Sequence, residues 1–461
     1  MAGQGNGPRS PTNSLGLSGT SPAETMQELR RLACLLYLWL PQLQCEEPAS
    51  TSPEQVHLSY PGDPTSMTVT WTTFGRAGSL VVFGPDLGAG FIHWARGRST
   101  KFADGGPLHR TMYIHRVTLN GLIPGRHYAY RCGSPKGWSR VFNFQALLNG
   151  TNWSPRFAIF GDMGKENPQS LPRLWRDTEL GLFDAILHVG DFAYDLDTNN
   201  AHVGDAFMRK IEPVAALVPY MTCPGNHESK YNFSNYRARF SMPGGTENLW
   251  YSWDIGPAHL VSFSTEVYFF LKYGKHLVAE QFQWLEKDLQ EASQPERRKE
   301  RPWIITMGHR PMYCSNNDLD DCTRHESIIR QGLHGHRYGL EDLFYKYGVD
   351  LELWAHEHSY ERLWPIYNYK VYNGSSRAPY TNPGAPVHII TGSAGCREQL
   401  DPFVPEAREW SAVRIEDYGY TRMQIFNWTH IWLEQVSDDQ NGQVVDGIWL
   451  IKEHHGPETW H

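Results

Sequence analysis

Hydrophobic and polar positions alternate in short runs between Gln55 and Gln145, for example at 66–73 and 128–132, and Gly, Pro and Asp residues separate the runs. An alternation with a period of two is typical of strands that bury one face. A series of such strands with turn residues between them predicts an all-β sandwich of about 90 residues, of fibronectin or immunoglobulin type.

The pattern changes after the polar stretch 149–155, where apolar runs of strand length are each followed by a sharp turn with polar residues. These runs lie at 156–162, 185–194, 220–228, 303–311 and 350–358. Continuously apolar strands are typical of sheets covered by helices on both faces, so we predict an α/β domain, which the strand patterns from Pro386 to Lys452 are expected to complete. The chain is thereby divided into an N-terminal extension at 1–50, a sandwich at 51–150 and an α/β domain at 151–461.

Functional side chains are expected at the carboxyl ends of these strands, where loops of an α/β sheet gather at one edge. The polar residues at these positions are, in chain order, Asp162, Asp191, Tyr194, Asn226, His227, His309, His356 and His358. They offer carboxylate, phenolate, amide and imidazole groups. His356 and His358 stand two apart, so both can face the same side of an extended segment while Glu357 between them points away.

This ordered set of motifs, from Gly161-Asp162 to Ala355-His356-Glu357-His358, resembles that of the purple acid phosphatases, within the calcineurin-like metallophosphoesterases. The resemblance extends from about residue 155 onward, and the sandwich resembles the N-terminal module of the larger family members. Two positions depart from the family pattern, because Ala355 replaces the usual Gly and Thr306 the usual Val. Neither position supplies a metal ligand.

The resemblance implies a binuclear metal site at the carboxyl ends of the strands. In it, Fe(III) would be bound by Asp162, Asp191, Tyr194 and His358, and a divalent Zn, Fe or Mn ion by Asn226, His309 and His356, with Asp191 bridging the two. Hard carboxylate and phenolate donors suit Fe(III), whereas imidazoles with an amide suit a divalent ion. One ion of each kind is expected per chain.

The activity that the resemblance implies is an acid phosphatase, in which a metal-bound hydroxide attacks phosphate monoesters. His227 matches a family residue that contacts phosphate, and His325, in the loop after His309, is expected to protonate the leaving group. Arg324 in the same loop is an alternative phosphate ligand. A phosphodiesterase or nucleotide hydrolase on the same scaffold is one alternative function, and a non-catalytic secreted binding protein is another. The complete set of metal-binding positions argues against the second.

Composition and charge exclude several other classes of protein. The chain has 461 residues, of which 40% are apolar and 20% charged, as in an ordinary globular protein rather than a disordered or fibrous one. The formal net charge is −8 and no long basic run is present, so binding to nucleic acid or to an anionic membrane is not expected. The sequence leaves the oligomeric state and the physiological substrate open.

The N-terminal region contains an apolar run at 32–40 behind Arg30 and Arg31, which resembles a secretory signal. The run is too short for a membrane-spanning helix, which needs about 20 residues. A polar stretch precedes it, so either Met1 or Met26 is the working start, and a buried or interfacial helix is the alternative interpretation. We expect a secreted protein, in an extracellular or lysosomal-type lumen, with cleavage near Cys45.

Cysteines and glycosylation sequons fit the same compartment. The sequons are at Asn149, Asn152, Asn232, Asn373 and Asn427. Cys314 and Cys322 flank a short polar loop and could form a disulfide in an oxidising environment. Cys132, Cys223 and Cys396 are expected to be buried thiols.

Overall fold

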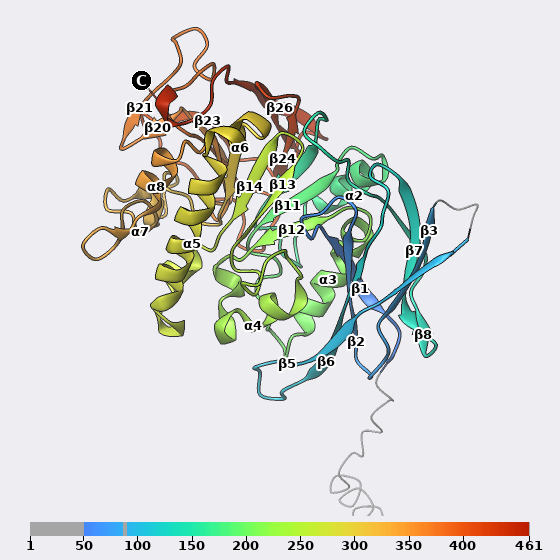
Figure 1. Ribbon diagram of the computed structural model, residues 1–461. Coiled ribbons are helices and arrows are strands. Elements are labelled where there is room, and N and C mark those ends of the chain that lie inside the picture. The colour runs from blue at the N-terminus through green and yellow to red at the C-terminus, as the bar shows by residue number, and fades with distance from the viewer. Residues whose placement is uncertain (1–49, 86–89, 461) are drawn as a thin grey trace, which may run out of the picture. The chain divides into compact units, whose positions relative to one another are not determined.

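A computed structural model describes residues 50–85 and 90–460 (Figure 1). The signal-like run at 32–40, Met26, Cys34 and Cys45 lie outside the described residues. Within the described ranges, no helix is both long and apolar enough to cross a membrane.

The N-terminal part is a sandwich of two antiparallel sheets, drawn in blue to teal in Figure 1. One sheet has the order β1 (Glu54–Ser59), β2 (Met67–Thr73), β6 (Thr111–Leu119) and β5 (Arg98–Ala103). The other has the order β4 (His93–Arg96), β3 (Leu80–Pro85), β7 (His127–Ser134) and β8 (Gly137–Trp138), with β9 (Phe142–Gln145) also paired to β7. The expected alternation fills the core between the sheets, where Trp71 is fully buried and stacks on His115 with 4.9 Å between ring centroids.

The remainder contains two larger sheets that share one hydrophobic core. The six-stranded sheet has the order β12 (Tyr220–Cys223), β11 (Ala185–Val189), β10 (Arg156–Phe160), β24 (Gly419–Ile425), β25 (His430–Ser437) and β26 (Gln443–Ile451). The seven-stranded sheet has the order β13 (Tyr251–Ile255), β14 (Ala258–Ser262), β15 (Trp303–Met307), β18 (Leu351–Trp354), β22 (Val387–Thr391), β19 (Tyr360–Leu363) and β23 (Ser411–Ile415). In the six-stranded sheet β12, β11 and β10 run parallel, and the C-terminal strands β24–β26 extend the sheet in antiparallel order. In the seven-stranded sheet β14, β15, β18 and β22 run parallel.

Helices and short hairpins complete this region. The α-helices are α2 (Leu171–Glu179), α3 (His202–Ala215), α4 (Lys230–Arg239), α5 (His276–Ala292), α6 (Pro295–Glu300), α7 (Ile328–Gln331) and α8 (Leu340–Lys346). Two hairpins are formed by β16 (Gly332–Leu333) with β17 (Arg337–Tyr338) and by β20 (Ile366–Tyr367) with β21 (Lys370–Val371). Strands such as β11 and β15 are buried at every position, which explains their continuously apolar sequences.

The sandwich is joined to the α/β region by polar contacts between β1 and α3. The backbone N–H of Val56 donates to Glu212 at 3.0 Å, and the side chain of Gln55 donates to Asp205 at 3.2 Å. Asp205 is fully buried and also pairs with Arg239, at 2.9 Å. The predicted fold class, a β-sandwich followed by an α/β region, is confirmed.

Candidate metal centre

The predicted site residues follow the carboxyl ends of strands from both large sheets. Asp162 follows β10, Asp191 and Tyr194 follow β11, Asn226 follows β12, His309 follows β15, and His356 and His358 follow β18. The first three strands belong to the six-stranded sheet and the last two to the seven-stranded sheet. The site therefore lies where the strand ends of two sheets converge.

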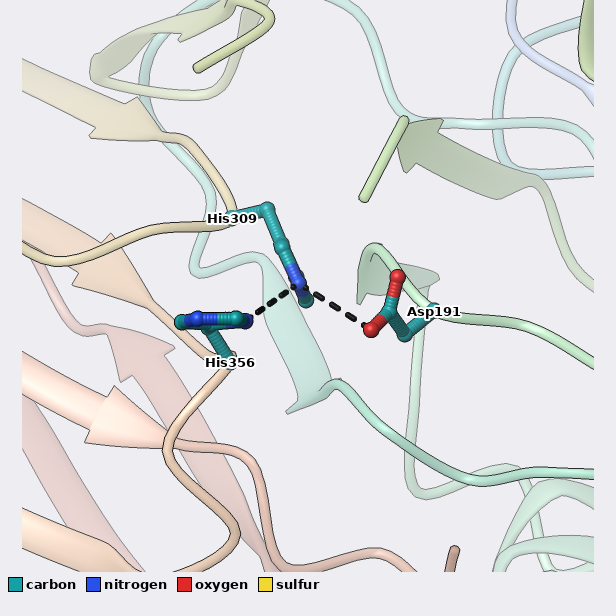
Figure 2. A group of neighbouring side chains, drawn as sticks. All are labelled: Asp191, His309 and His356. Atoms are coloured by element: carbon teal, nitrogen blue, oxygen red, sulfur yellow. Dashed lines mark hydrogen bonds and ion pairs between the residues drawn. The ribbon is translucent and has the colours of Figure 1, made fainter. Parts of the chain in front are cut away.

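One half of the cluster is centred on His309, whose ring lies between Asp191 and His356 in Figure 2. Its Nε2 is 3.3 Å from Asp191 Oδ2 and 3.2 Å from His356 Nδ1. The same nitrogen is 3.1 Å from Asn226 Oδ1. The ring is held in this position because its Nδ1 donates to the carbonyl of Val189 at the end of β11, at 2.8 Å.

The other half contains Asp162, Tyr194 and His358. The Tyr194 hydroxyl lies 3.2 Å from Asp162 Oδ1 and 2.9 Å from His358 Nε2. The two halves are linked because the backbone N–H of His356 donates to Asp162 Oδ2 at 2.9 Å. Asp162, Tyr194 and His358 thus lie on one side of the cluster and Asn226, His309 and His356 on the other, where Asp191 faces His309.

Local backbone geometry shows how unusual these loops are. Asp162, Asp191, Tyr194 and His356 have φ values of 57°, 53°, 48° and 72°, in the left-handed region that residues with a side chain rarely adopt. Backbone strain of this kind persists where the surrounding structure enforces it, typically at functional sites. A glycine is required nearby, because a Cβ on Gly225 would lie 2.1 Å from Asp191 Oδ1.

The departure from the family pattern at Ala355 also has a structural explanation. Gly161 lies opposite, and a Cβ on Gly161 would meet the Cβ of Ala355 at 2.3 Å. The absence of a side chain at Gly161 therefore makes room for the methyl group of Ala355, and the segment that leads to His356 can keep its position.

Electrostatics in the cluster favour bound cations. Burial lowers the pKa of His309, but the charges of Asp191 and Asp162 outweigh this effect and raise that pKa to about 10. Burial alone would raise the pKa of Asp191, yet the facing His309 holds it below its usual range. At His358 burial is outweighed by the Asp162 carboxylate, and the pKa rises to about 12. Two buried carboxylates thus draw positive charge toward themselves, and this donor set fits metal ions.

His227 lies beside the cluster and has a partner that the sequence analysis did not identify. Its Nδ1 is 2.5 Å from Asp195 Oδ1, and its backbone N–H donates to Asp191 Oδ1 at 3.0 Å. Burial lowers its pKa, but Asp191 and Asp195 together raise the pKa to about 9. A protonated imidazole in this position can donate a hydrogen bond to an anionic ligand.

Glu228 is the last residue of the run 220–228, and its role was not predicted from the sequence. It is 3% exposed, and its carboxylate accepts hydrogen bonds from the backbone N–H groups of Asp191, Phe192 and Gly225 at 2.9, 3.0 and 2.9 Å. Because these groups belong to the loops after β11 and β12, Glu228 fixes one loop against the other. The arrangement positions Asp191 next to Asn226.

The loop after β15 reaches the cluster through Asp320, which the sequence analysis also missed. Asp320 Oδ2 lies 2.5 Å from His356 Nε2, and Arg310 Nη1 lies 2.7 Å from the same nitrogen. His325 is exposed in this loop, and its ring stacks on Tyr369 with 4.9 Å between centroids. Within the described ranges no hydrogen bond or ion pair joins His325 to the seven predicted ligands, so its catalytic role stays a prediction.

The disulfide expected in this loop is present between Cys314 and Cys322, with 5.3 Å between the Cα atoms. It closes the segment that carries Asp320. Cys132, Cys223 and Cys396 are free and buried, as predicted.

Comparisons with known proteins cover nearly the whole described region. The family model for the purple acid phosphatase N-terminal domain matches residues 53–146, the model for calcineurin-like phosphoesterases matches 155–360, and the model for the C-terminal part of iron/zinc purple acid phosphatase-like proteins matches 385–447.

Two curated proteins called acid phosphatase type 7 are similar over most of their length. The mouse protein (Mus musculus) is 65% identical, over 93% of this chain and 98% of its own. The human protein (Homo sapiens) is 66% identical, over 91% of this chain and 95% of its own. Among solved structures, the purple acid phosphatase PPD1 from yellow lupin (Lupinus luteus) seeds is 28% identical with a TM-score of 0.73, covering 88% of this chain and 75% of the lupin chain.

Proposed function

Because the chain belongs to the purple acid phosphatase family and is therefore an acid phosphatase, we propose that it hydrolyses phosphate monoesters with two metal ions held by the strand-end cluster. The family implies a binuclear metal centre. The observation that carries the proposal is the division of the donors into two linked groups, with Asp162, Tyr194 and His358 in one and Asn226, His309 and His356 in the other.

The proposed ligands differ in chemistry between the two groups. Fe(III) would be held by the carboxylate, phenolate and imidazole of Asp162, Tyr194 and His358, because hard anionic oxygens suit a trivalent ion. A divalent Zn, Fe or Mn ion would be held by the amide and the two imidazoles. Asp191 would bridge the ions, which is supported by its Oδ2 facing His309 while its loop also carries Tyr194. When bound, the two ions supply positive charge for the phosphate and activate water for in-line attack.

The protein's own residues would bind and orient the ester. His227 would donate a hydrogen bond to a phosphate oxygen, and Asp195 would hold its ring through Nδ1. Arg310 would provide further positive charge near His356, and Glu266 fixes its guanidinium at 3.1 Å. The leaving alcohol needs a proton, for which His325 is the proposed source.

Secretion is also part of the proposal. Support comes from the signal-like run, from the Cys314–Cys322 disulfide and from the exposed positions of Asn149, Asn152, Asn373 and Asn427. Disulfides persist mainly in oxidising compartments, and glycans attach to accessible sequons.

Kinetics and metal analysis on the same preparation test this function. Purified protein should hydrolyse an aryl phosphate monoester at acidic pH, prefer it to the matching diester, and contain one iron and one divalent ion per chain. A diester preference would favour the phosphodiesterase alternative. Protein that carries both metals and hydrolyses neither ester would support a non-catalytic binding protein. Cytosolic protein without glycans would contradict the secretion proposal.

A further inference from the structure

A second group of carboxylates lies beside the candidate metal centre and uses none of its seven predicted ligands. Asp318, Glu357 and Asp401 each offer an oxygen within 4.8 Å of the others. They come from three separate segments, namely the disulfide-closed loop after β15, the turn between β18 and β19, and the loop after β22. Three carboxyl groups from distant parts of the chain therefore converge on one point.

Glu357 is the unusual member of this group because it alone is buried. The residue is 1% exposed, and its Oε2 has no hydrogen-bond partner among the described residues. Its Oε1 lies 3.0 Å from Cys322 Sγ, but that sulfur is bonded to Cys314 and carries no proton to donate. Keeping a buried carboxylate ionised without a positive partner is costly, so a cation bound beside Glu357 would stabilise its charged form.

The other two carboxylates have oxygens that could bind such a cation. Asp401 accepts a hydrogen bond from the backbone N–H of His358 through Oδ2, at 2.8 Å, and its Oδ1 forms no hydrogen bond with the described residues. Asp318 is exposed, so a cation between these groups can be reached from solvent. In the loop, Asn316, Asp318 and Asp320 alternate in the way that oxygen ligands alternate in many calcium-binding loops.

We propose that Asp318, Glu357 and Asp401 bind a calcium ion that is separate from the catalytic metals. All three donors are hard carboxylate oxygens, and they lie on irregular loops, which suits the flexible coordination of calcium better than the strict octahedron of magnesium. None of the three proposed ligands is an imidazole, the donor that favours zinc or divalent iron. The ion ties the loop after β15 to the segment between His356 and His358.

This link has a consequence for the catalytic cluster. Glu357 also lies within 4.8 Å of Asp320 and His356. A calcium ion on Asp318 and Glu357 thus fixes the loop at the point where Asp320 contacts His356 Nε2. The ion acts as a structural clamp that holds Asp320 in place and does not touch the substrate.

Calorimetric titration of the full chain, loaded with its catalytic metals, tests the site directly. Calcium chloride should bind with a Kd of about 0.1–1 mM, the range of calcium sites in extracellular modules, and magnesium chloride at least tenfold more weakly. Glu357→Gln and Asp318→Asn, which keep the side-chain shapes, should each weaken calcium binding at least tenfold. Glu409→Gln is the matched control, because Glu409 is exposed and its carboxylate has no hydrogen-bond or ion-pair partner in the described part of the chain; it should bind calcium like the wild type.

A further variant separates this site from the catalytic one. His309→Ala should lose phosphatase activity and divalent metal yet keep calcium binding. The proposal is overturned if the wild type binds no calcium at millimolar concentrations, or if both carboxylate variants bind it as tightly as the wild type. Calcium binding that disappears in His309→Ala and persists in Asp318→Asn would place the ion at the catalytic cluster and would also overturn it. If Glu357→Gln does not fold, Asp318→Asn still tests the site, because Asp318 is exposed and its substitution should not prevent folding.

Discussion

Replacing both Cys314 and Cys322 by Ser is expected to destabilise the protein while leaving the metal cluster occupied. The disulfide joins residues 8 apart in sequence. Loop-closure entropy for a loop of this length corresponds to about 2.5 kcal/mol of free energy of unfolding at 25 °C. With an unfolding entropy of about 2.1 cal/mol/K per residue, this loss lowers Tm by about 3 °C. The serine hydroxyls would also occupy buried positions, which adds to the loss.

The assay combines differential scanning calorimetry with metal analysis of the same samples. None of the seven proposed ligands lies within the segment that the disulfide closes, so iron and divalent metal should remain at wild-type levels. Phosphatase activity should fall, because this segment carries Asp320, which contacts His356. Cys132→Ser is the matched control, because Cys132 is a buried cysteine of the sandwich that forms no disulfide, and it should leave the phosphatase activity unchanged. An unchanged Tm with unchanged activity would refute the reasoning, and so would loss of both metals.

Two further predictions concern ion pairs of histidine. His259 lies 2.8 Å from Asp254 and 2.9 Å from Asp288, and although burial lowers its pKa, these carboxylates raise the pKa from 6.5 to about 9. Below pH 6.5 the pairing therefore adds about 3 kcal/mol to the free energy of unfolding, and this contribution is lost as the pH rises through 9. The Tm measured by calorimetry should fall between pH 6.5 and 9 in the wild type, and it should fall less in His259→Gln. Asp195→Asn should lower kcat/KM about tenfold, because it weakens a charge-assisted hydrogen bond to His227, and the metal content should stay unchanged. Equal kcat/KM in the wild type and the variant would contradict the proposed role of Asp195.

The metal-binding positions could be predicted from sequence because each directly follows a short apolar strand. Strands of an α/β sheet end at one edge, so residues as distant as Asp162 and His356 could be expected to meet without knowledge of the loops. The alternation around Glu357 likewise predicts its direction away from the metals, and in the structure it faces the disulfide. That the strands belong to two sheets was not visible in the sequence, since burial patterns do not show which strands pair.

The partners of the cluster were harder to predict because they depend on loop conformation. Asp320 contacts His356 from within a loop that the disulfide closes, and an isolated Asp in a polar loop carries no signal of this contact. Glu228 had a weak signal, since it follows His227 in the motif after β12, but its three N–H donors come from backbone groups that any residue has. Asp401 lies far from the other motifs in sequence, so its approach to Glu357 depends on the tertiary structure alone.

The visible absorption spectrum of the purified protein, compared with that of Tyr194→Phe, tests the proposed metal centre most directly. The substitution removes only the phenol oxygen that lies 3.2 Å from Asp162 and 2.9 Å from His358. Tyr130→Phe, in the sandwich, is the matched control, because its hydroxyl is buried and donates to the carbonyl of Ala216. If Tyr194 binds Fe(III), the wild type and the control are purple, and Tyr194→Phe loses the charge-transfer band. Iron-containing, active wild-type protein with the same spectrum as Tyr194→Phe would contradict the account.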